Sequence, residues 1–163
     1  MSVQAFVMLQ KEQREELLPG LYAAARACGR THVFVDAAPC QTYVLWQERM
    51  TAALDDPQRY LLLLYGQDKL AGYVQYSLQE DVVLLEYAVI APEWQSTPLF
   101  RMGCQYLLQQ LPPHIRYLDD WVSTQRPAAI DVNRRIGMET VGETENGAYV
   151  RMRAQIPDVK KLF

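Results

Sequence analysis

Residues 89–111, VIAPEWQSTPLFRMGCQYLLQQL, decide the fold class of this 163-residue chain. They begin as an apolar β-strand that Pro92 ends, and they close as an amphipathic helix expected at residues 97–110. The turn between the two lies where many α/β proteins bind a phosphate, because a helix N-terminus attracts anions. Such turns are usually rich in glycine, whereas this one has no glycine before Gly103. The stretch therefore predicts either an anion site with an unusual lining or a plain strand–turn–helix connection.

Helical and extended patterns alternate along the rest of the chain. Apolar residues at helical spacing predict helices at residues 13–28, 42–54 and 127–137. Apolar runs bounded by turn residues predict strands, which are expected at residues 3–9, 59–66, 69–78, 81–91 and 117–123, followed by a hairpin over residues 138–155 that turns at Asn146-Gly147. The order β-α-α-β-β-β-α-β-α-β-β indicates the α/β (α+β) class. We expect one domain, residues 1–163, with a mixed sheet of six to seven strands and about four helices.

Three residues within these elements carry specific expectations. Pro19 marks either a break in the first helix or its start. Gly66 is expected to supply flexible backbone before the turn at Gln67-Asp68. Gly72 is expected to mark a β-bulge or a close approach between two strands.

Composition excludes several classes of function. The net charge is −3, and no dense run of Lys and Arg predicts a nucleic-acid interface. No apolar run is long enough to cross a membrane, and the N-terminus lacks the pattern of a secretory signal. The three cysteines and two histidines are not at metal-ligand spacing, so neither a metal site nor a disulfide framework is expected. These observations predict a soluble protein in a reduced, cytoplasmic setting.

Three segments, in this order, resemble motifs of the GNAT superfamily of N-acetyltransferases. They are DKLAGYVQY (68–76), YAVIAPEWQ (87–95) and AAIDVNRRIGMETVG (128–142). The resemblance covers nearly the whole chain. It implies that two parallel central strands, 82–90 and 117–123, splay apart and that acetyl-CoA binds in the cleft between them. It also implies transfer of the acetyl group to a primary amine by direct attack, without a covalent enzyme intermediate.

The resemblance assigns cofactor contacts to three places. The backbone of Ala88, Val89 and Ile90 would pair with the pantetheine arm. The pyrophosphate would lie on the turn and first helical residues, namely Gln95, Ser96, Thr97, Leu99, Phe100 and Arg101. Arg126 would assist there, and Asn133 would contact the cofactor from the position where the family often has a tyrosine that protonates the departing thiolate.

The chain departs from the family pattern in the loop and at that tyrosine. Pro98 and Phe100 occupy two positions that are usually glycine, and proline has no N–H to donate. Ser96 or Thr97 is expected to cap the helix, with Pro98 in its first turn. Asparagine cannot supply a proton at neutral pH, so Asn133 cannot replace the tyrosine. These departures favour an alternative, a GNAT-fold protein that has lost catalysis and serves as a binding or regulatory module.

Catalytic candidates are few. Glu86 lies among apolar strand residues and is the candidate base, with its pKa raised by those surroundings; the alternative is a carboxylate facing solvent. Tyr149 is the candidate acid. Asp119 and Asp120 could bind a cationic acceptor, or could simply keep the strand end soluble. The acceptor itself is expected to be a small-molecule or peptide amine, and the terminal segment VKKLF (159–163) could dock on a second copy in a homodimer.

Overall fold

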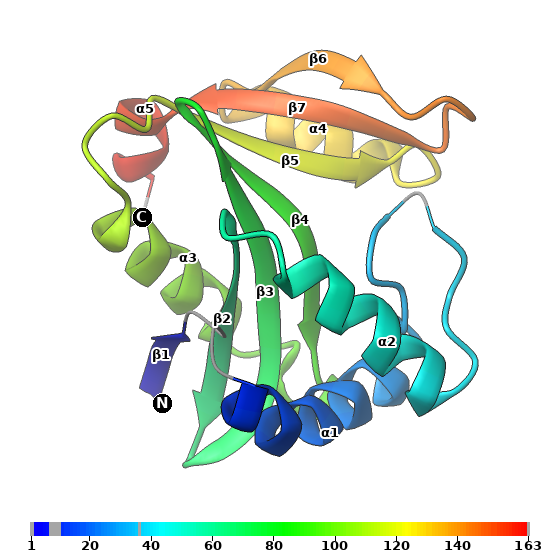
Figure 1. Ribbon diagram of the computed structural model, residues 1–163. Helices are drawn as coiled ribbons and strands as arrows, with labels where there is room; N and C mark the ends of the chain where they lie inside the picture. Colours follow the sequence, from blue (N-terminus) through cyan, green and yellow to red (C-terminus); the bar gives the residue numbers. More distant parts are fainter. Residues whose placement is uncertain (1, 7–10, 36, 163) are drawn as a thin grey trace.

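The computed structural model describes residues 2–6, 11–35 and 37–162, and it is built on one seven-stranded sheet (Figure 1). The strand order is β1-β2-β3-β4-β5-β7-β6, and every neighbouring pair is antiparallel except β4 and β5. The strands are β1 (Ser2–Phe6), β2 (Arg59–Gly66), β3 (Lys69–Gln79), β4 (Val82–Ile90), β5 (Tyr117–Ser123), β6 (Glu139–Glu143) and β7 (Tyr149–Gln155). A mixed sheet with one parallel central pair confirms the predicted fold class.

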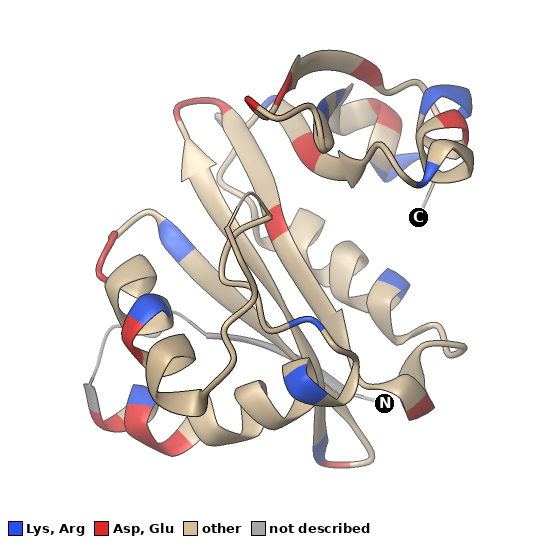
Figure 2. Cartoon of the chain, turned by 90° about the vertical axis from the view of Figure 1, so that its right-hand side faces the viewer, with Lys and Arg blue, Asp and Glu red and all other residues tan. Residues whose placement is uncertain are grey.

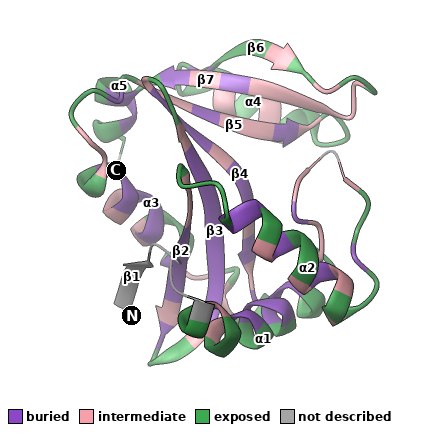
Figure 3. Cartoon of the chain, in the orientation of Figure 1, coloured by how far each residue is buried: buried purple, intermediate pink, exposed green. Residues whose placement is uncertain are grey.

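Helices cover both faces of this sheet. They are α1 (Lys11–Ala27), α2 (Tyr43–Leu54), α3 (Leu99–Gln110), α4 (Pro127–Arg135) and α5 (Ile156–Lys160), with a short 3₁₀ turn η1 (Pro92–Trp94) before α3. The first two helices pack on one face of β2–β4 and α3 packs on the opposite face. On that second side of the sheet, α4 packs against β5, and α5 packs against β5 and β7. Because both faces are covered, the middle strands are buried along most of their length (Figure 3).

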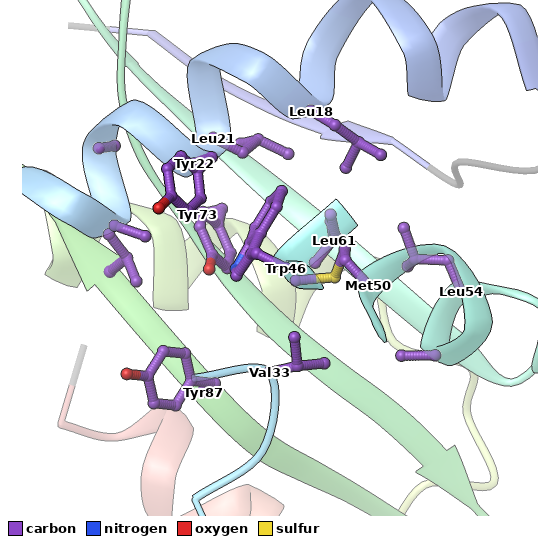
Figure 4. Close-up of a cluster of buried hydrophobic side chains, with 14 of the residues drawn as sticks. Leu18, Leu21, Tyr22, Val33, Trp46, Met50, Leu54, Leu61, Tyr73 and Tyr87 are labelled. Carbon is purple, nitrogen blue, oxygen red and sulfur yellow. The ribbon is translucent and has the colours of Figure 1, made fainter. Parts of the chain in front are cut away.

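The core beneath α1 and α2 is dominated by large side chains (Figure 4). Trp46 from α2 and Tyr73 from β3 are fully buried there, together with Leu18 and Leu21 from α1. Pro19 lies inside α1 and neither breaks nor starts the helix. Burial of the apolar residues on either side of Pro19 holds the helix together despite the missing hydrogen bond.

Other boundaries differ in detail from the predictions. The first strand is described over Ser2–Phe6, and residues 7–9 of the predicted strand lie outside the described residues. A short fifth helix, α5, follows β7 and was not predicted, because five residues are too few to show helical periodicity. Its Val159 packs into the protein's own core, so this part of VKKLF is not available to dock on a neighbour.

The two parallel strands separate after only four paired residues. Val82–Leu85 of β4 pair with residues 117–120 of β5, and no pairing continues beyond Leu85. At this point Glu86 is the extra residue of a β-bulge, because Leu85 pairs with Tyr76 of β3 and Tyr87 pairs with Gln75. A bulge bends its strand and increases the local twist, so β4 turns away from β5 here. This geometry confirms the predicted splay.

The turn between β2 and β3 is made by its own two residues. Gln67 and Asp68 have positive φ angles of 51° and 63°, which gives the backbone the twist that a two-residue hairpin needs. The expectation that Gly66 supplies this freedom is wrong, because Gly66 is not among the described residues with a positive φ. A Cβ at Gly66 would instead overlap the ring of Trp94. Glycine is therefore required at position 66 to make room for the side chain of Trp94.

Gly72 lies at a close approach between β3 and β4, which is one of the two predicted alternatives. A Cβ there would overlap the carbonyl oxygen of Val89, which belongs to the backbone and cannot swing away. We expect Gly72→Ala to lower the free energy of unfolding by about 2 kcal/mol, because the strands must separate to admit the methyl group. Urea denaturation would measure this loss. Gly142→Ala is the matched control, since its Cβ would be 3.9 Å from the nearest side chain; an equal loss in both variants would contradict the prediction.

Candidate functional site

A cavity of about 560 Å³ lies where β4 and β5 diverge. Its walls come from both strands, from the loop before α2, and from the first residues of α3 and α4. Seven of the residues that the sequence singled out line this cleft: Glu86, Ala88, Phe100, Asp120, Arg126, Asn133 and Tyr149. The divergence of the strands thus gathers residues from five separate parts of the chain into one site.

The other predicted contact residues do not line the cleft. The side chains of Val89 and Leu99 are fully buried in the two cores, so only their backbone could contact a ligand. The amide of Gln95 donates to the carbonyl oxygen of Ile90 at 3.0 Å and closes the end of β4. Arg101 is exposed and donates to the carbonyl oxygen of Leu162 at 3.1 Å.

The start of α3 differs from the prediction. The helix begins at Leu99, so Pro98 is the N-cap residue rather than a first-turn residue, and it offers no side-chain cap. Thr97 Oγ1 donates to the carbonyl oxygen of Trp94 at 2.6 Å and accepts only a long bond, 3.4 Å, from the N–H of Leu99. Phe100 is 40% exposed and lines the cleft instead of turning into the core. The start of α3 therefore has no side-chain cap from its N-cap residue, and it places an aromatic side chain in the cleft.

Glu86 is not enclosed by apolar groups alone, which corrects the sequence expectation. Arg59, the first residue of β2, reaches across β3 and binds both carboxylate oxygens of Glu86, at 2.7 and 3.1 Å. The two side chains are only 15% and 8% exposed. Arg59 also donates to the carbonyl oxygen of Ala53 at 2.9 Å, and its guanidinium lies 4.9 Å from the ring centre of Phe34. Glu86 is therefore a charge-paired residue that anchors the bulge.

Asp119 and Asp120 lie on opposite faces of β5, because successive side chains of a strand alternate. Asp119 is fully buried and is held by Arg151 and Arg153 of β7, with N–O distances of 2.6 and 2.8 Å. It does not line the cleft, so it is unsuited to bind an acceptor there. Asp120 does line the cleft, and burial raises its pKa to about 7. Only one of the two carboxyl groups is therefore available to the site.

Three residues that sequence analysis did not propose as functional also line the cleft: Arg30, His32 and Tyr87. His32 Nδ1 lies 3.0 Å from the hydroxyl oxygen of Tyr87, and Arg30 Nε donates to the same oxygen at 3.4 Å. Burial, and then the charge of Arg30, lower the pKa of His32. Burial also raises the pKa of Tyr87, which keeps its hydroxyl protonated. The loop of His32 has no periodicity, so no signal in the sequence indicated that it reaches β4.

A second cavity of about 560 Å³ opens beside the cleft. It is lined by Phe34 and Leu84 and by residues 143–146 at the end of β6, and it shares Val35, Glu86 and Trp121 with the cleft. Two exposed carboxylates, Glu143 and Glu145, belong to its rim, and none of its lining residues is basic. A cation could therefore approach the cleft from this side.

Among the residues that the structure describes, the surface charges, the metal-ligand side chains and the helices indicate no additional kind of site. Basic residues are scattered among acidic ones in the view of Figure 2, without a continuous basic stripe. Within the described part of the chain, no three His, Cys, Asp or Glu side chains are grouped as metal ligands. None of the helices described here has the length and apolar character needed to span a membrane.

Comparison with known proteins supports the fold by structure alone. No protein-family model and no curated protein matches the sequence. Among solved structures, an acetyltransferase from Thermus thermophilus is similar with a TM-score of 0.70 and 14% identity, over 95% of this chain and 97% of that one. The ribosomal-protein-S18-alanine N-acetyltransferase of Escherichia coli is similar with a TM-score of 0.65 and 18% identity, over 95% and 93% of the two chains.

A spermidine/spermine N-acetyltransferase, SpeG from Vibrio cholerae, is also similar, with a TM-score of 0.60 and 14% identity over 99% of this chain and 98% of that one. These likenesses extend over nearly the full length of each protein. Together with the splayed parallel strands and the bulge at Glu86, they define the fold. The chain has the fold of the GNAT superfamily of N-acetyltransferases.

Proposed function

We propose that the protein is an N-acetyltransferase that moves an acetyl group from acetyl-CoA to a primary amine. The observation that carries this proposal is the separation of β4 from β5 over a cavity of about 560 Å³. A pair of parallel strands normally stays hydrogen-bonded, and separation leaves backbone N–H and C=O groups that need another partner. The fold is shared with acetyltransferases, which supports the same conclusion by analogy.

The residues present fit the donor. Beyond Leu85, β4 has a strand partner on one side only, so the backbone around Ala88 faces the opening and can pair with the amides of the pantetheine arm. The first hydrogen bond of α3 runs from Met102 to Pro98, which leaves the N–H of Phe100 outside the helical ladder. That N–H and the positive end of the helix dipole would hold the pyrophosphate, with Arg126 at the rim of the cleft.

The chemistry is a direct acyl transfer. The nitrogen of the acceptor attacks the carbonyl carbon of the thioester, the carbon–sulfur bond breaks, and an amide and the thiol of CoA are formed. Backbone N–H groups at the splay would stabilise the developing oxyanion. Tyr149 lines the cleft from the start of β7 and, in this proposal, returns a proton to the thiolate, since Asn133 cannot do so.

The acceptor would enter through the second cavity, because this cavity meets the cleft at Glu86 and Trp121. The carboxylates at its rim favour an acceptor that arrives as a protonated amine. Asp120 also lines the cleft, but it does so from the face of the sheet that α3 covers, opposite to the face of α1 and α2.

A binding or regulatory module without catalysis is the second candidate. Pro98 at the N-cap, the exposed Phe100 and Asn133 in the place of a proton donor favour it. The two candidates agree on the fold and differ in whether the cleft takes acetyl-CoA and turns it over.

Acetyl-CoA at 100 times its dissociation constant should stabilise the protein by about 2.7 kcal/mol, which raises the melting temperature of a domain of this size by about 5 to 10 °C. Differential scanning fluorimetry with acetyl-CoA up to millimolar concentration measures this shift. Ala88→Phe should abolish the shift by filling the cleft, whereas Val132→Phe, at an exposed position on α4, should preserve it. No shift in the wild-type protein would overturn the proposed function.

A further inference from the structure

The loop between α1 and α2 holds His32 in a fixed position over β4. The buried amide of Gln75 on β3 donates to the carbonyl oxygen of Val33 at 3.0 Å. Thr31 Oγ1 donates to the carbonyl oxygen of Cys40 at 2.7 Å, and the N–H of Cys40 donates back to Thr31 at 3.0 Å. Residues on both sides of His32 are thus tied to the core and to the far end of the loop. The imidazole is placed by the fold and not by a mobile segment.

The partner of His32 is the residue that follows the bulge. Tyr87 is 5% exposed, its hydroxyl lies 3.0 Å from His32 Nδ1, and the two ring centres are 5.9 Å apart. Arg30 covers the Tyr87 ring with its guanidinium 4.7 Å from the centre. All three residues line the cleft at the point where β4 leaves β5. They lie on the face of the sheet that α1 and α2 cover.

The carboxyl groups near the cleft are either paired with arginine or lie on the face of the sheet that α3 covers. Glu86 is bound through both oxygens by Arg59, and Asp119 is bound by two arginines. Asp120 points to the face of α3, where it lies near Cys104. Consider the described residues that line the cleft on the face of the sheet covered by α1 and α2. Among them, His32 is the one whose side chain is uncharged at neutral pH and has a nitrogen able to accept a proton.

We propose that His32 accepts the proton that the acceptor amine must lose before it attacks, and that Tyr87 and Arg30 hold its imidazole in place. This inference rests on the proposed acetyl transfer. In it, Nδ1–H donates to the hydroxyl oxygen of Tyr87, and the lone pair of Nε2 takes one proton from the incoming ammonium and later releases it to solvent. The nitrogen then forms its bond to the carbonyl carbon and the carbon–sulfur bond breaks. Tyr149 gives its proton to the thiolate and recovers one from the second proton of the amine.

The charged surroundings of His32 agree with this role. Cys28, which follows α1, and Arg30 in the loop both lie near Tyr87 of β4. Arg30 also lies near His32. Burial and then Arg30 lower the pKa of His32, so the imidazole is in its basic form at neutral pH. The charge of Arg30 also acts on Asp120 of β5, where it opposes the rise in pKa that burial causes. The charge of Glu86 is neutralised by its ion pair with Arg59. No carboxylate is hydrogen-bonded to His32 among the described residues, so none favours the imidazolium.

The chain has only two histidines, which allows a direct test of position without a known acceptor. Protein labelled with ¹⁵N-histidine gives two sets of imidazole signals, which His32→Gln assigns; the exposed His114 is the internal control. Acetyl-CoA should shift the signal of His32 and leave that of His114 unchanged. His32 should also titrate below the ordinary value near 6.5, and Tyr87→Phe should change its tautomer. A rise in melting temperature with acetyl-CoA but no change at His32 would overturn the inference and leave the proposed function intact.

Turnover with two small nucleophiles separates a catalytic role from a structural one. Ethylamine is protonated at neutral pH and needs a proton acceptor, whereas hydroxylamine is mostly uncharged and does not. His32→Gln should lower kcat/KM about 100-fold with ethylamine and only a few-fold with hydroxylamine, while the thermal shift with acetyl-CoA persists. The limb of the pH profile that reports His32, below the ordinary histidine value near 6.5, should disappear with ethylamine, and the rate of the variant should instead rise with pH as free ethylamine forms. His114→Gln is the matched control and should behave as wild type.

Three outcomes of this assay would overturn the inference. One is an equal loss with both nucleophiles and an unchanged pH profile, which would mean a structural role. Another is a wild-type rate with ethylamine in His32→Gln. The third, the absence of CoA release by a wild-type protein that binds acetyl-CoA, would overturn the proposed acetyl transfer together with the inference. Failure of acetyl-CoA to bind is a different result, because it overturns the proposed function itself.

Discussion

Arg59→Met should lower the free energy of unfolding by about 3 to 5 kcal/mol, because it leaves the carboxylate of Glu86 buried without its counter-ion. Arg59 satisfies both oxygens of Glu86, donates to Ala53 at the end of α2 and covers the ring of Phe34. Methionine keeps an unbranched apolar stem, is shorter than arginine and makes none of these polar contacts. Equilibrium urea denaturation at neutral pH measures the loss. We also expect weaker acetyl-CoA binding, since the bulge that parts β4 from β5 loses its anchor.

A double-mutant cycle tests whether the cost comes from the unpaired charge. Arg59→Met combined with Glu86→Met removes both charges and should recover most of the stability, because two apolar side chains of similar size can fill the site. Arg14→Met is the matched control, since its contact with Asp55 lies at a carboxylate that is 68% exposed. Additive losses in the double variant would contradict the explanation.

Asp120→Asn should stabilise the protein at pH 8 by about 2 to 3 kcal/mol. Burial raises the pKa of Asp120 from 3.8 to about 7, and each pKa unit corresponds to about 1.4 kcal/mol, so the full difference is about 4 kcal/mol; partial exposure reduces it. The pKa of Asp120 in the folded protein lies above its pKa in the unfolded chain. The loss of stability caused by ionising Asp120 is therefore absent at pH values below both. It grows as the pH rises from about 4 to 7 and stays constant above that range. Asparagine keeps the shape of the side chain without the charge.

The measurement is urea denaturation of both proteins from pH 4 to pH 8. The stability difference between Asp120→Asn and wild type should approach zero at the acidic end and reach its maximum above pH 7. Asp131→Asn, at an exposed position on α4, should differ from wild type by less than about 0.5 kcal/mol throughout. A difference that does not depend on pH would contradict the assignment of a buried, titrating acid. A buried carboxyl that destabilises the fold within a cleft is a common mark of a functional site.

Local patterns predicted most of the fold. The continuous apolar run of β4, the Pro127 and Gly137 that bound the helix α4, and the turn at Asn146-Gly147 each specify an element within a few residues. The bulge at Glu86 could not be predicted, because it depends on the register between β3 and β4. The helix start at Leu99 also differed, since Thr97 uses its hydroxyl on Trp94 instead of on the helix.

The site was predicted less completely, for a related reason. Glu86, Asp120 and Tyr149 were expected in the cleft and line it. The residues that contact one another in the site come from elements far apart in the sequence. Arg59, the partner of Glu86, lies 27 positions before it, and His32 lies 55 positions before its partner Tyr87. Neither residue belongs to a recognisable motif, so only the folded chain brings each to its partner.

The sequence by itself determined the order of the elements, which follows from periodicity and turn chemistry acting over short stretches of chain. The expectation that two central parallel strands separate came from the resemblance of three segments to GNAT motifs, whereas the residue at which they separate was decided by the register between β3 and β4. Only the tertiary structure decided which carboxyl groups are free to act. Asp119 and Asp120 are adjacent and identical in the sequence, yet alternation along β5 turns one toward two arginines of β7 and the other into the cleft. The chemistry of a side chain here depends on its partners, and long-range packing supplies them.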